Sequence, residues 1–288
     1  MLRVSPRCKT SACSGVLVQT AMTCSLPPEI LELIVDHLRN EPTTLKACCL
    51  VSKSWVPQTR RYLFARIVFF GPARSIEAWK LAFPDPSNSL AHHTRTLSFR
   101  RLDTATLADP GVGHWIRTLY RVEKLHLNFL RRHNHEISFI RLHGFSSTLK
   151  SLCLVHFSIP LSKIFNLICS FPLLEDLGLF AITPKSDTDE WNPPPTSPKL
   201  TGTISIGGAI RSVVRRLCDL PYGLHFSKIA VSRHESSEDV ASTMDLVLRC
   251  SGTLESLTIS GYATGASVPA LATGQHLTGA RERRHAFA

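Results

Sequence analysis

Apolar residues return at nearly constant intervals through the middle of this chain. The repeated pattern places a leucine or related residue at the first, fourth and sixth positions of a six-residue string. The strings are TRTLSF (94–99), VEKLHL (122–127), LKSLCL (149–154), LEDLGL (174–179), the degenerate LTGTISI (200–206), FSKIAV (226–231) and LESLTI (254–259). Their central residues are 25 to 28 residues apart, and they are Leu97, Leu125, Leu152, Leu177, Ile204, Ile229 and Leu257. A fixed period in the twenties is typical of a solenoid built from a short strand and a return segment.

Several return segments have the apolar spacing of amphipathic helices. The residues that recur on one helical face are Ile164, Phe165, Ile168 and Cys169, then Val213, Val214 and Leu217, and then Val240, Met244, Val247 and Leu248. Ser237 is the expected cap of the last helix, and Gly252 its expected end. The alternation predicts an α/β fold, an irregular leucine-rich-repeat solenoid with parallel strands on the concave side and helices on the convex side.

A different pattern precedes the repeats. The segment SLPPEILELIVDHLRNEPTTLKACCLVSKSW (25–55) predicts a helix that starts near Pro27 and Pro28 and ends at 40–42. A second helix follows, with Thr43 or Thr44 as its cap, and a third runs from Trp55 to Phe64. Three helices this short hold too little core to be robust alone.

The patterns divide the chain into five parts. We expect a disordered tail over 1–24, the helical module over 25–67, a helical junction over 68–93, the repeats over 94–262 and an irregular tail over 263–288. Ile76, Trp79 and Leu81 predict a short helix in the junction. The Pro-rich, polar residues 183–199 predict a loop inserted in one repeat.

Charge and cysteine content narrow the classes of function. The chain has 33 basic and 22 acidic residues, a net charge of +11, but the arginine pairs are scattered and no nucleic-acid-reading motif accompanies them. We therefore expect a solvated basic surface and no specific nucleic-acid partner. No apolar run approaches the ~20 residues that span a membrane, so we expect a soluble protein. Nine cysteines without a C-x-x-C pair favour the cytosol or nucleus.

The first 24 residues allow two interpretations. They contain Arg3, Arg7 and Lys9 but no acidic residue, which loosely resembles a transit peptide. The alternative, which we favour, is a disordered tail upstream of Met22 as the functional initiator.

No catalytic motif is present in the sequence. Phosphate-binding, serine-hydrolase and zinc-protease signatures are absent. His133 and His135 could share a metal, but no second pair of ligands lies near them. Asp187, Asp189 and Glu190 form an acidic triplet without a partner motif. We expect no enzymatic activity, no metal and no cofactor.

The helical module resembles the F-box, the adaptor-binding module of cullin–RING ubiquitin ligases. LPPEILELIVDHL followed by LVSKSW carries the resemblance, and RYLF (61–64) is similar to the segment that follows the module in many fungal F-box proteins. Ser52 stands where the family usually has a Cys. The resemblance covers roughly residues 25–66, and in this family leucine-rich repeats often follow the module.

This resemblance implies a bridging role in a Skp–cullin–F-box ubiquitin ligase. The residues expected to bind the Skp-type adaptor, and through it the cullin–RING ligase, are Leu26, Pro27, Ile30, Leu31, Ile34, Leu38, Leu50, Val51 and Trp55. The repeats would hold a protein substrate, whose identity the sequence does not reveal. Catalysis would belong to the ubiquitin-conjugating enzyme that the assembly recruits.

The residues between the buried leucines of each strand are expected to point outward on the concave face. From these we predict six substrate-binding residues, Arg100, Lys124, His126, Asn128, Asp176 and Phe180. Two other functions stay open. One is an adaptor-bound scaffold outside the ligase, and the other is a basic nucleic-acid-associated repeat protein.

Overall fold

The computed structural model describes residues 26–84, 90–102, 109–129, 139–184, 191–195, 197–208, 210–234 and 236–262. Both predicted tails lie outside these ranges, as do His133, His135 and the acidic triplet of the inserted loop. The chain forms two compact units that divide between Thr59 and Arg60. None of the helices in the described part is long and apolar enough to cross a membrane.

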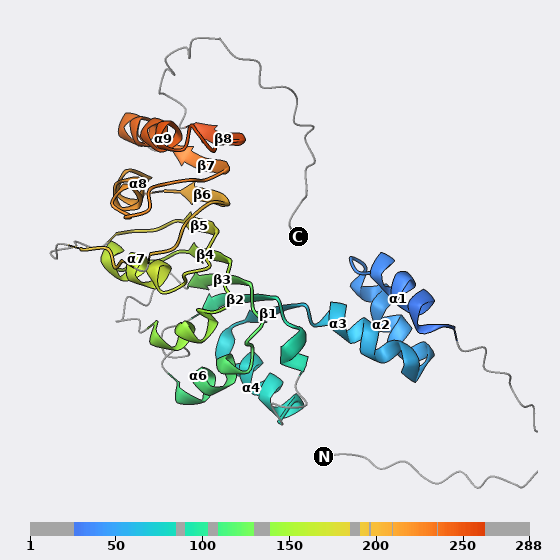
Figure 1. The fold of residues 1–288 in the computed structure, drawn as a ribbon. Coiled ribbons are helices and arrows are strands. Elements are labelled where there is room, and N and C mark those ends of the chain that lie inside the picture. The colour runs from blue at the N-terminus through green and yellow to red at the C-terminus, as the bar shows by residue number, and fades with distance from the viewer. Residues whose placement is uncertain are drawn as a thin grey trace, which may run out of the picture. The chain divides into compact units, whose positions relative to one another are not determined.

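The first unit is helical (Figure 1). Its elements are α1 (Pro28–His37), α2 (Pro42–Val51), the 3₁₀ helix η1 (Lys53–Trp55) and the start of α3 (Val56–Leu63). The predicted cap of the second helix was wrong, because Pro42 already occupies the first helical position and Glu41 is the N-cap residue. Thr44 instead donates its hydroxyl proton to Glu41 Oε2 at 3.0 Å.

The helical unit has a small core. Leu31 and Val35 of α1 are buried, as are Leu45 of α2 and Thr59 of α3. The hydroxyl of Thr59 donates to the carbonyl of Trp55 at 2.8 Å, so this buried polar group is satisfied. Burying a Leu or Val side chain contributes about 1.5–3 kcal/mol, so three such residues give this unit little stability of its own.

The second unit contains one all-parallel sheet of eight strands in the order β1 to β8. The strands are β1 (Arg66–Phe70), β2 (Thr96–Leu102), β3 (Lys124–Phe129), β4 (Ser151–Val155), β5 (Asp176–Phe180), β6 (Thr203–Gly207), β7 (Lys228–His234) and β8 (Ser256–Tyr262). The seven predicted strand segments correspond to β2–β8, which confirms the α/β fold class. Each strand pairs with its neighbours in sequence, so no crossover skips a strand.

The register of the sheet follows the sequence period. The central residues of the repeated strings face one another across successive strands, in the series Leu97, Leu125, Leu152, Leu177, Ile204, Ile229 and Leu257. Ile67 of β1 extends this series by pairing with Leu97. Because side chains alternate along a strand, these residues and those two positions later form one layer, which is buried from β1 to β7 and half-buried in β8.

Helices of the second unit pack on the face of the sheet that carries this buried layer (Figure 1). They are α4 (Pro72–Ala82), α6 (Pro110–Arg117), α7 (Leu161–Cys169), α8 (Ile210–Cys218) and α9 (Ser237–Arg249), with the 3₁₀ helices η2 (Leu90–His93) and η3 (Ile140–Phe145) between strands. The predicted helical faces of α7 and α8 are confirmed, since all seven of their predicted residues are buried. We call the opposite side of the sheet the open face.

Helix α9 differs from its prediction. Its N-cap is Ser236, whose hydroxyl accepts a hydrogen bond from the backbone N–H of Asp239 at 3.2 Å, and not Ser237. Asp239, Thr243 and Leu246 are its buried residues, whereas Leu248, predicted for the core, is 66% exposed. The prediction from apolar spacing failed here because two polar residues, Asp239 and Thr243, face the core. Both are hydrogen-bonded there, and a pattern of hydrophobic residues does not detect them.

Besides the short 3₁₀ helices, one strand and one α-helix were not predicted. Strand β1 spans the proposed boundary at residue 67, and its string FARIVF (64–69) is an aromatic version of the repeat with Phe64 and Phe69 at the outer apolar positions. The sequence of helix α6 is PGVGHWIR, and its two glycines interrupt the apolar spacing that would have predicted a helix. The Asp109 side chain caps α6 by accepting from Gly111 N at 2.7 Å, while Trp115 and Ile116 are buried.

One residue has a left-handed backbone at the same register position in five of the repeats, directly after the strand in four of them and inside β2 in the other. These residues are Gly71 (φ 59°), Arg101 (φ 59°), His156 (φ 62°), Ala181 (φ 50°) and Gly208 (φ 77°). The backbone N–H of Ala181 donates to Gly207 O at 2.7 Å, and that of His156 donates to Phe180 O at 3.0 Å. After β1, β4, β5 and β6 the conformation is therefore part of the turn that leads the chain out of the sheet, whereas Arg101 adopts it at an irregularity within β2.

Candidate functional site

The helical unit exposes large apolar side chains. Leu50 is 88% exposed, Val51 is 72% exposed and Leu33 is 67% exposed, and Leu26 and Ile30 are exposed as well. Several large hydrophobic side chains exposed on one small unit indicate an interaction surface or a risk of aggregation. We call Leu26, Ile30, Leu33, Leu50 and Val51 the apolar surface of the helical unit.

The nine predicted adaptor-binding residues fall into three groups. Leu26, Pro27, Ile30, Leu50 and Val51 are exposed; Ile34, Leu38 and Trp55 are half-buried; and Leu31 is buried. Leu31 lies in the core of the unit, so it can act on a partner only by supporting the exposed residues. Leu33, which the motif did not single out, is exposed beside Ile30 and Ile34 in sequence and has the same apolar character.

Outward side chains form three rows across the open face. The amino row contains Arg66, Thr96, Lys124, Ser151, Asp176, Thr203 and Lys228; the central row contains Val68, Ser98, His126, Cys153, Gly178, Ser205 and Ala230; and the carboxyl row contains Phe70, Arg100, Asn128, Val155, Phe180, Gly207 and Ser232. The middle of the face is therefore lined by small side chains from β4 to β7.

The six predicted substrate-binding residues all lie on the open face but in different rows. Arg100, Asn128 and Phe180 belong to the carboxyl row. Lys124 and Asp176 belong to the amino row, four residues away along their strands, which is about 13 Å. One small ligand cannot contact both rows, so only an extended partner would reach the whole predicted set.

His126 lies in the central row and is only partly accessible. Its Nδ1 is 3.5 Å from the hydroxyl of Ser98, and its Nε2 is buried without a partner among the described residues. Burial, and then the positive charges of Arg100 and Arg66, lower the pKa of His126 from its ordinary 6.5. The ring is therefore neutral at pH 7 and adds no positive charge to the open face.

Cys153 follows His126 in the central row. Burial raises the pKa of its thiol to about 11, so the thiolate is scarce at neutral pH. A thiol in this state is a poor nucleophile. Cys153 is therefore a weak candidate for a nucleophile beside Ser98 and His126.

Asp176 and Phe180 are engaged with the sheet itself. Asp176 Oδ1 accepts a hydrogen bond from the backbone N–H of Thr203 at 2.6 Å. The Phe180 ring lies against two glycines, since a Cβ on Gly207 would lie 3.0 Å from its Cδ1 and one on Gly178 would lie 3.2 Å from its Cε2. Phe180 therefore covers a strip of bare backbone between β5 and β6.

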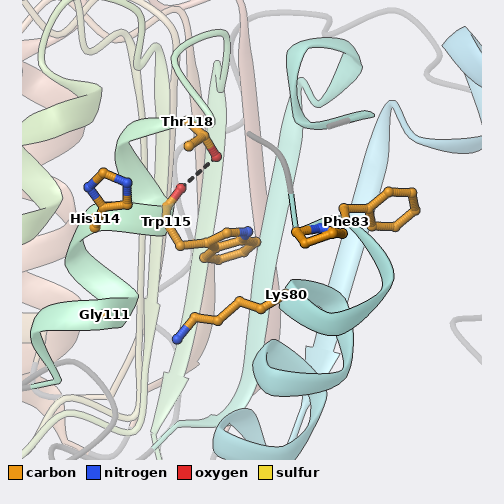
Figure 2. Close-up of a pocket in the computed structure, with 7 residues that line it drawn as sticks. Lys80, Phe83, Gly111, His114, Trp115 and Thr118 are labelled. Atoms are coloured by element: carbon orange, nitrogen blue, oxygen red, sulfur yellow. Dashed lines mark hydrogen bonds between the residues drawn. The ribbon is translucent and has the colours of Figure 1, made fainter. Parts of the chain in front are cut away.

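A cavity of about 550 Å³ lies on the helical side of the sheet, between α4 and α6 (Figure 2). Its lining includes Lys80, Phe83, Gly111, His114 and Trp115. Figure 2 shows the Trp115 ring reaching from α6 toward α4, with the Lys80 side chain running beside it.

The polar groups of this cavity are poorly placed for a ligand. The Lys80 ammonium is paired with Glu77 Oε1 at 2.8 Å. Trp115 is 7% exposed, and its indole N–H is buried without a partner in the described part of the chain. This cavity therefore offers mainly an apolar wall.

Within the described residues, no group of three or more His, Cys, Asp or Glu side chains could hold a metal ion. Comparison with known proteins adds no assignment, because no protein-family model, curated protein or solved structure matches the chain.

Proposed function

We propose that this protein is the substrate-recognition subunit of a Skp–cullin–F-box ubiquitin ligase. In this proposal the helical unit is an F-box that binds the Skp-type adaptor, and the strands and helices that follow are an irregular leucine-rich-repeat solenoid that binds a protein substrate. The chain supplies binding, and ubiquitin transfer belongs to the conjugating enzyme of the assembly. The expected location is the cytoplasm, the nucleus or both.

The observation that carries the proposal is the exposure of motif residues in the helical unit. Leu50 and Val51 match the second half of the F-box motif, and both side chains are largely exposed at the end of α2. A unit with so few buried apolar residues gains most by covering such side chains with a partner. Burying each of them would contribute about 1.5–3 kcal/mol.

The arrangement of the sheet supports the proposal of a leucine-rich-repeat solenoid. Eight strands run in sequence order, all parallel, and the central residue of each repeated string pairs with that of the next. In a leucine-rich-repeat solenoid with strands on the concave side, the open face would be the concave surface. Its varied outward residues would then meet the substrate.

The adaptor role is tested by co-purification of the full chain with a Skp-type adaptor and a cullin. The variant is Leu50→Ser with Val51→Ser, which should remain folded because both side chains are already exposed. Hot-spot truncations cost about 2 kcal/mol or more, roughly thirtyfold in affinity, so adaptor and cullin should both be lost. Leu81→Ser is the matched control, a leucine of the second unit that is 82% exposed.

The outcomes separate the competing functions. Retention of the adaptor by the folded double variant would overturn the F-box assignment. Adaptor without cullin in the wild-type complex would favour the scaffold outside the ligase. Salt-sensitive retention on DNA or RNA, without adaptor, would favour the nucleic-acid-associated alternative.

A further inference from the structure

A second cavity, of about 570 Å³, opens at the carboxyl ends of the first three strands. We call it the carboxyl-edge pocket, and its lining is Phe70, Gly71, Arg100, Arg101 and Asn128. Two arginines thus line one cavity together with an asparagine and a phenylalanine. The described residues that line it include no carboxylate.

A break in strand β2 brings the two arginines together. Successive residues of a regular strand point to opposite faces, which would send Arg101 toward the buried layer that contains Phe99. The register between β2 and β3 instead shifts between Arg100 and Leu102, and Arg101 has a left-handed backbone. Such a bulge redirects a side chain, and here it leaves Arg101 exposed beside Arg100.

Neither arginine is neutralised within the described part of the chain. The ion pairs between described residues use other side chains, such as Arg95 with Glu123 and Arg211 with Glu238. The Arg100 guanidinium lies 5.2 Å from the centre of the Phe70 ring, a cation–π contact that holds it over the pocket. Phe70 itself is 60% exposed, so its ring can also meet a ligand.

We propose that the carboxyl-edge pocket binds an oxyanion, a phosphate or carboxylate, that a protein segment carries next to an aromatic or other apolar group. Guanidinium groups bind planar or tetrahedral oxyanions through paired N–H donors, and the Asn128 amide adds a further donor. The exposed Phe70 ring provides the apolar contact. This proposal deepens the substrate-binding half of the proposed function and rests on it for the identity of the ligand's carrier.

A protein segment fits the surroundings better than a nucleic acid. Beyond Asn128 the carboxyl row continues with Val155, Phe180, Gly207 and Ser232, none of which is charged. A nucleic-acid strand places a charge at every nucleotide and needs a cationic track. A protein segment that carries one anion next to apolar side chains is complementary to this row, in which the two arginines are followed by the apolar Val155 and Phe180.

The test uses calorimetric titration of the full chain at low ionic strength with three probes, namely phenylphosphate, inorganic phosphate and phenol. Phenylphosphate should bind most tightly, because it alone presents both the anion and the ring. Arg101→Gly should weaken its binding about tenfold or more, since a hydrogen bond to a charged group is lost. Phe70→Ala should remove the advantage of phenylphosphate over inorganic phosphate.

Matched variants keep the test decisive. Arg101→Gly suits the left-handed backbone, so the variant should fold. His156→Gly makes the same change at the equivalent turn after β4, outside the pocket, and should bind phenylphosphate like the wild type. Equal affinity in all three chains, or no measurable binding to the wild type, would overturn the proposal. Arg100→Gln gives an independent second variant with the same expected loss.

Competition then identifies the carrier of the anion. Peptides with a phosphotyrosine, or with a glutamate beside a phenylalanine, should displace phenylphosphate and distinguish the phosphate from the carboxylate. Stronger displacement by an oligonucleotide of equal charge, or binding of inorganic phosphate as tight as that of phenylphosphate, would overturn the assignment to a protein segment. Adaptor binding is measured on the same chains. A wild-type chain that does not bind the adaptor would contradict the proposed function. A wild-type chain that binds the adaptor but no anion would contradict only this inference.

Discussion

Asp176 Oδ1 accepts the backbone N–H of Thr203 at 2.6 Å, and this bond joins the starts of β5 and β6 across the connection that carries the inserted loop. Backbone pairing between the two strands begins one residue later, at Leu177 and Ile204. The carboxylate thus extends the strand pairing by one position, after a connection of more than twenty residues has returned the chain to the sheet.

Asp176→Ala should therefore lower the stability of the second unit. A hydrogen bond to a charged group contributes about 1.5–3 kcal/mol, and the half-exposed position of Asp176 favours the low end. For a unit of this size each kcal/mol corresponds to about 2–4 °C in Tm, measured by thermal unfolding of the full chain. Asp176→Asn keeps the accepting oxygen and should lose less, while the exposed Asp219→Ala is the control. Equal Tm values for Asp176→Ala and Asp219→Ala would contradict the assigned role.

Gly208→Ala should destabilise the protein through its backbone alone. Gly208 has φ 77°, and a Cβ there would meet nothing closer than 3.8 Å, so space is available. An L-residue in this conformation costs about 1–2 kcal/mol, which exceeds the gain of about 0.4–1 kcal/mol from a stiffer unfolded chain.

The matched control is Gly252→Ala, at a glycine with ordinary φ and open space around its Cβ position. Only the unfolded-state gain applies there, so Gly252→Ala should raise the free energy of unfolding slightly. Urea unfolding of both variants measures the difference. A Gly208→Ala chain as stable as the Gly252→Ala chain would show that the turn after β6 does not require a left-handed residue.

His126 should make the second unit less stable in mild acid. Its pKa is lowered from 6.5 by burial and by Arg100 and Arg66, so the unfolded chain takes up a proton on this ring at a higher pH than the folded chain does. Between the two pKa values the unfolded state binds more protons, and the free energy of unfolding falls as the pH drops below about 6.5.

His126→Gln removes this proton uptake and should flatten the fall between about pH 7 and about pH 5. His93, whose pKa is also lowered by burial, by His92 and by nearby arginines, is present in both chains and cancels in the comparison. Urea titrations at the two pH values give the slopes. Parallel slopes for the two chains would mean that His126 titrates alike in the folded and unfolded states.

Strand β1 should be indispensable to the second unit. Phe69 stacks on Phe99 with ring centres 5.6 Å apart and meets Trp115 edge-on at 5.2 Å, so the strand completes the core. A chain beginning at Arg60 should unfold cooperatively, whereas one beginning at Leu90 lacks β1 and α4 and should bind a hydrophobic dye. Equal thermal unfolding of the two chains would contradict this role of β1.

The repeated strands and two of the helices could be predicted from the sequence. Leucine at a constant spacing is required wherever a strand must fill the same layer, so β2–β8 and the buried faces of α7 and α8 could be predicted. Strand β1 escaped because Phe64 and Phe69 replace leucines, and α6 because glycines dilute its apolar pattern. In α9 the buried Asp239 and Thr243 carry hydrogen bonds that a hydrophobicity pattern does not record.

The sequence predicted which residues lie on the open face, but not which of them lie next to one another. Alternation along a strand placed Arg100, Lys124 and Asn128 on the open face, as the sheet register confirms. The association of Arg100 with Arg101 depends on a bulge, which a pattern of alternating residues does not reveal. Phe70 was missed along with β1. The presence of Arg100 and Asn128 on neighbouring strands was the available signal.

Among the described residues, every strand hydrogen-bonds only to the strands before and after it in sequence, so no strand pairing links the first strands of the second unit directly to the last ones. Tension applied at Tyr262 would act first on the pairing of β7 with β8 and reach β6 only after that pairing had failed. The sheet would unfold sequentially from its C-terminal end, one strand and helix at a time, because each repeat contacts only its neighbours. Resistance to mechanical unfolding would thus be divided into small successive steps along the chain.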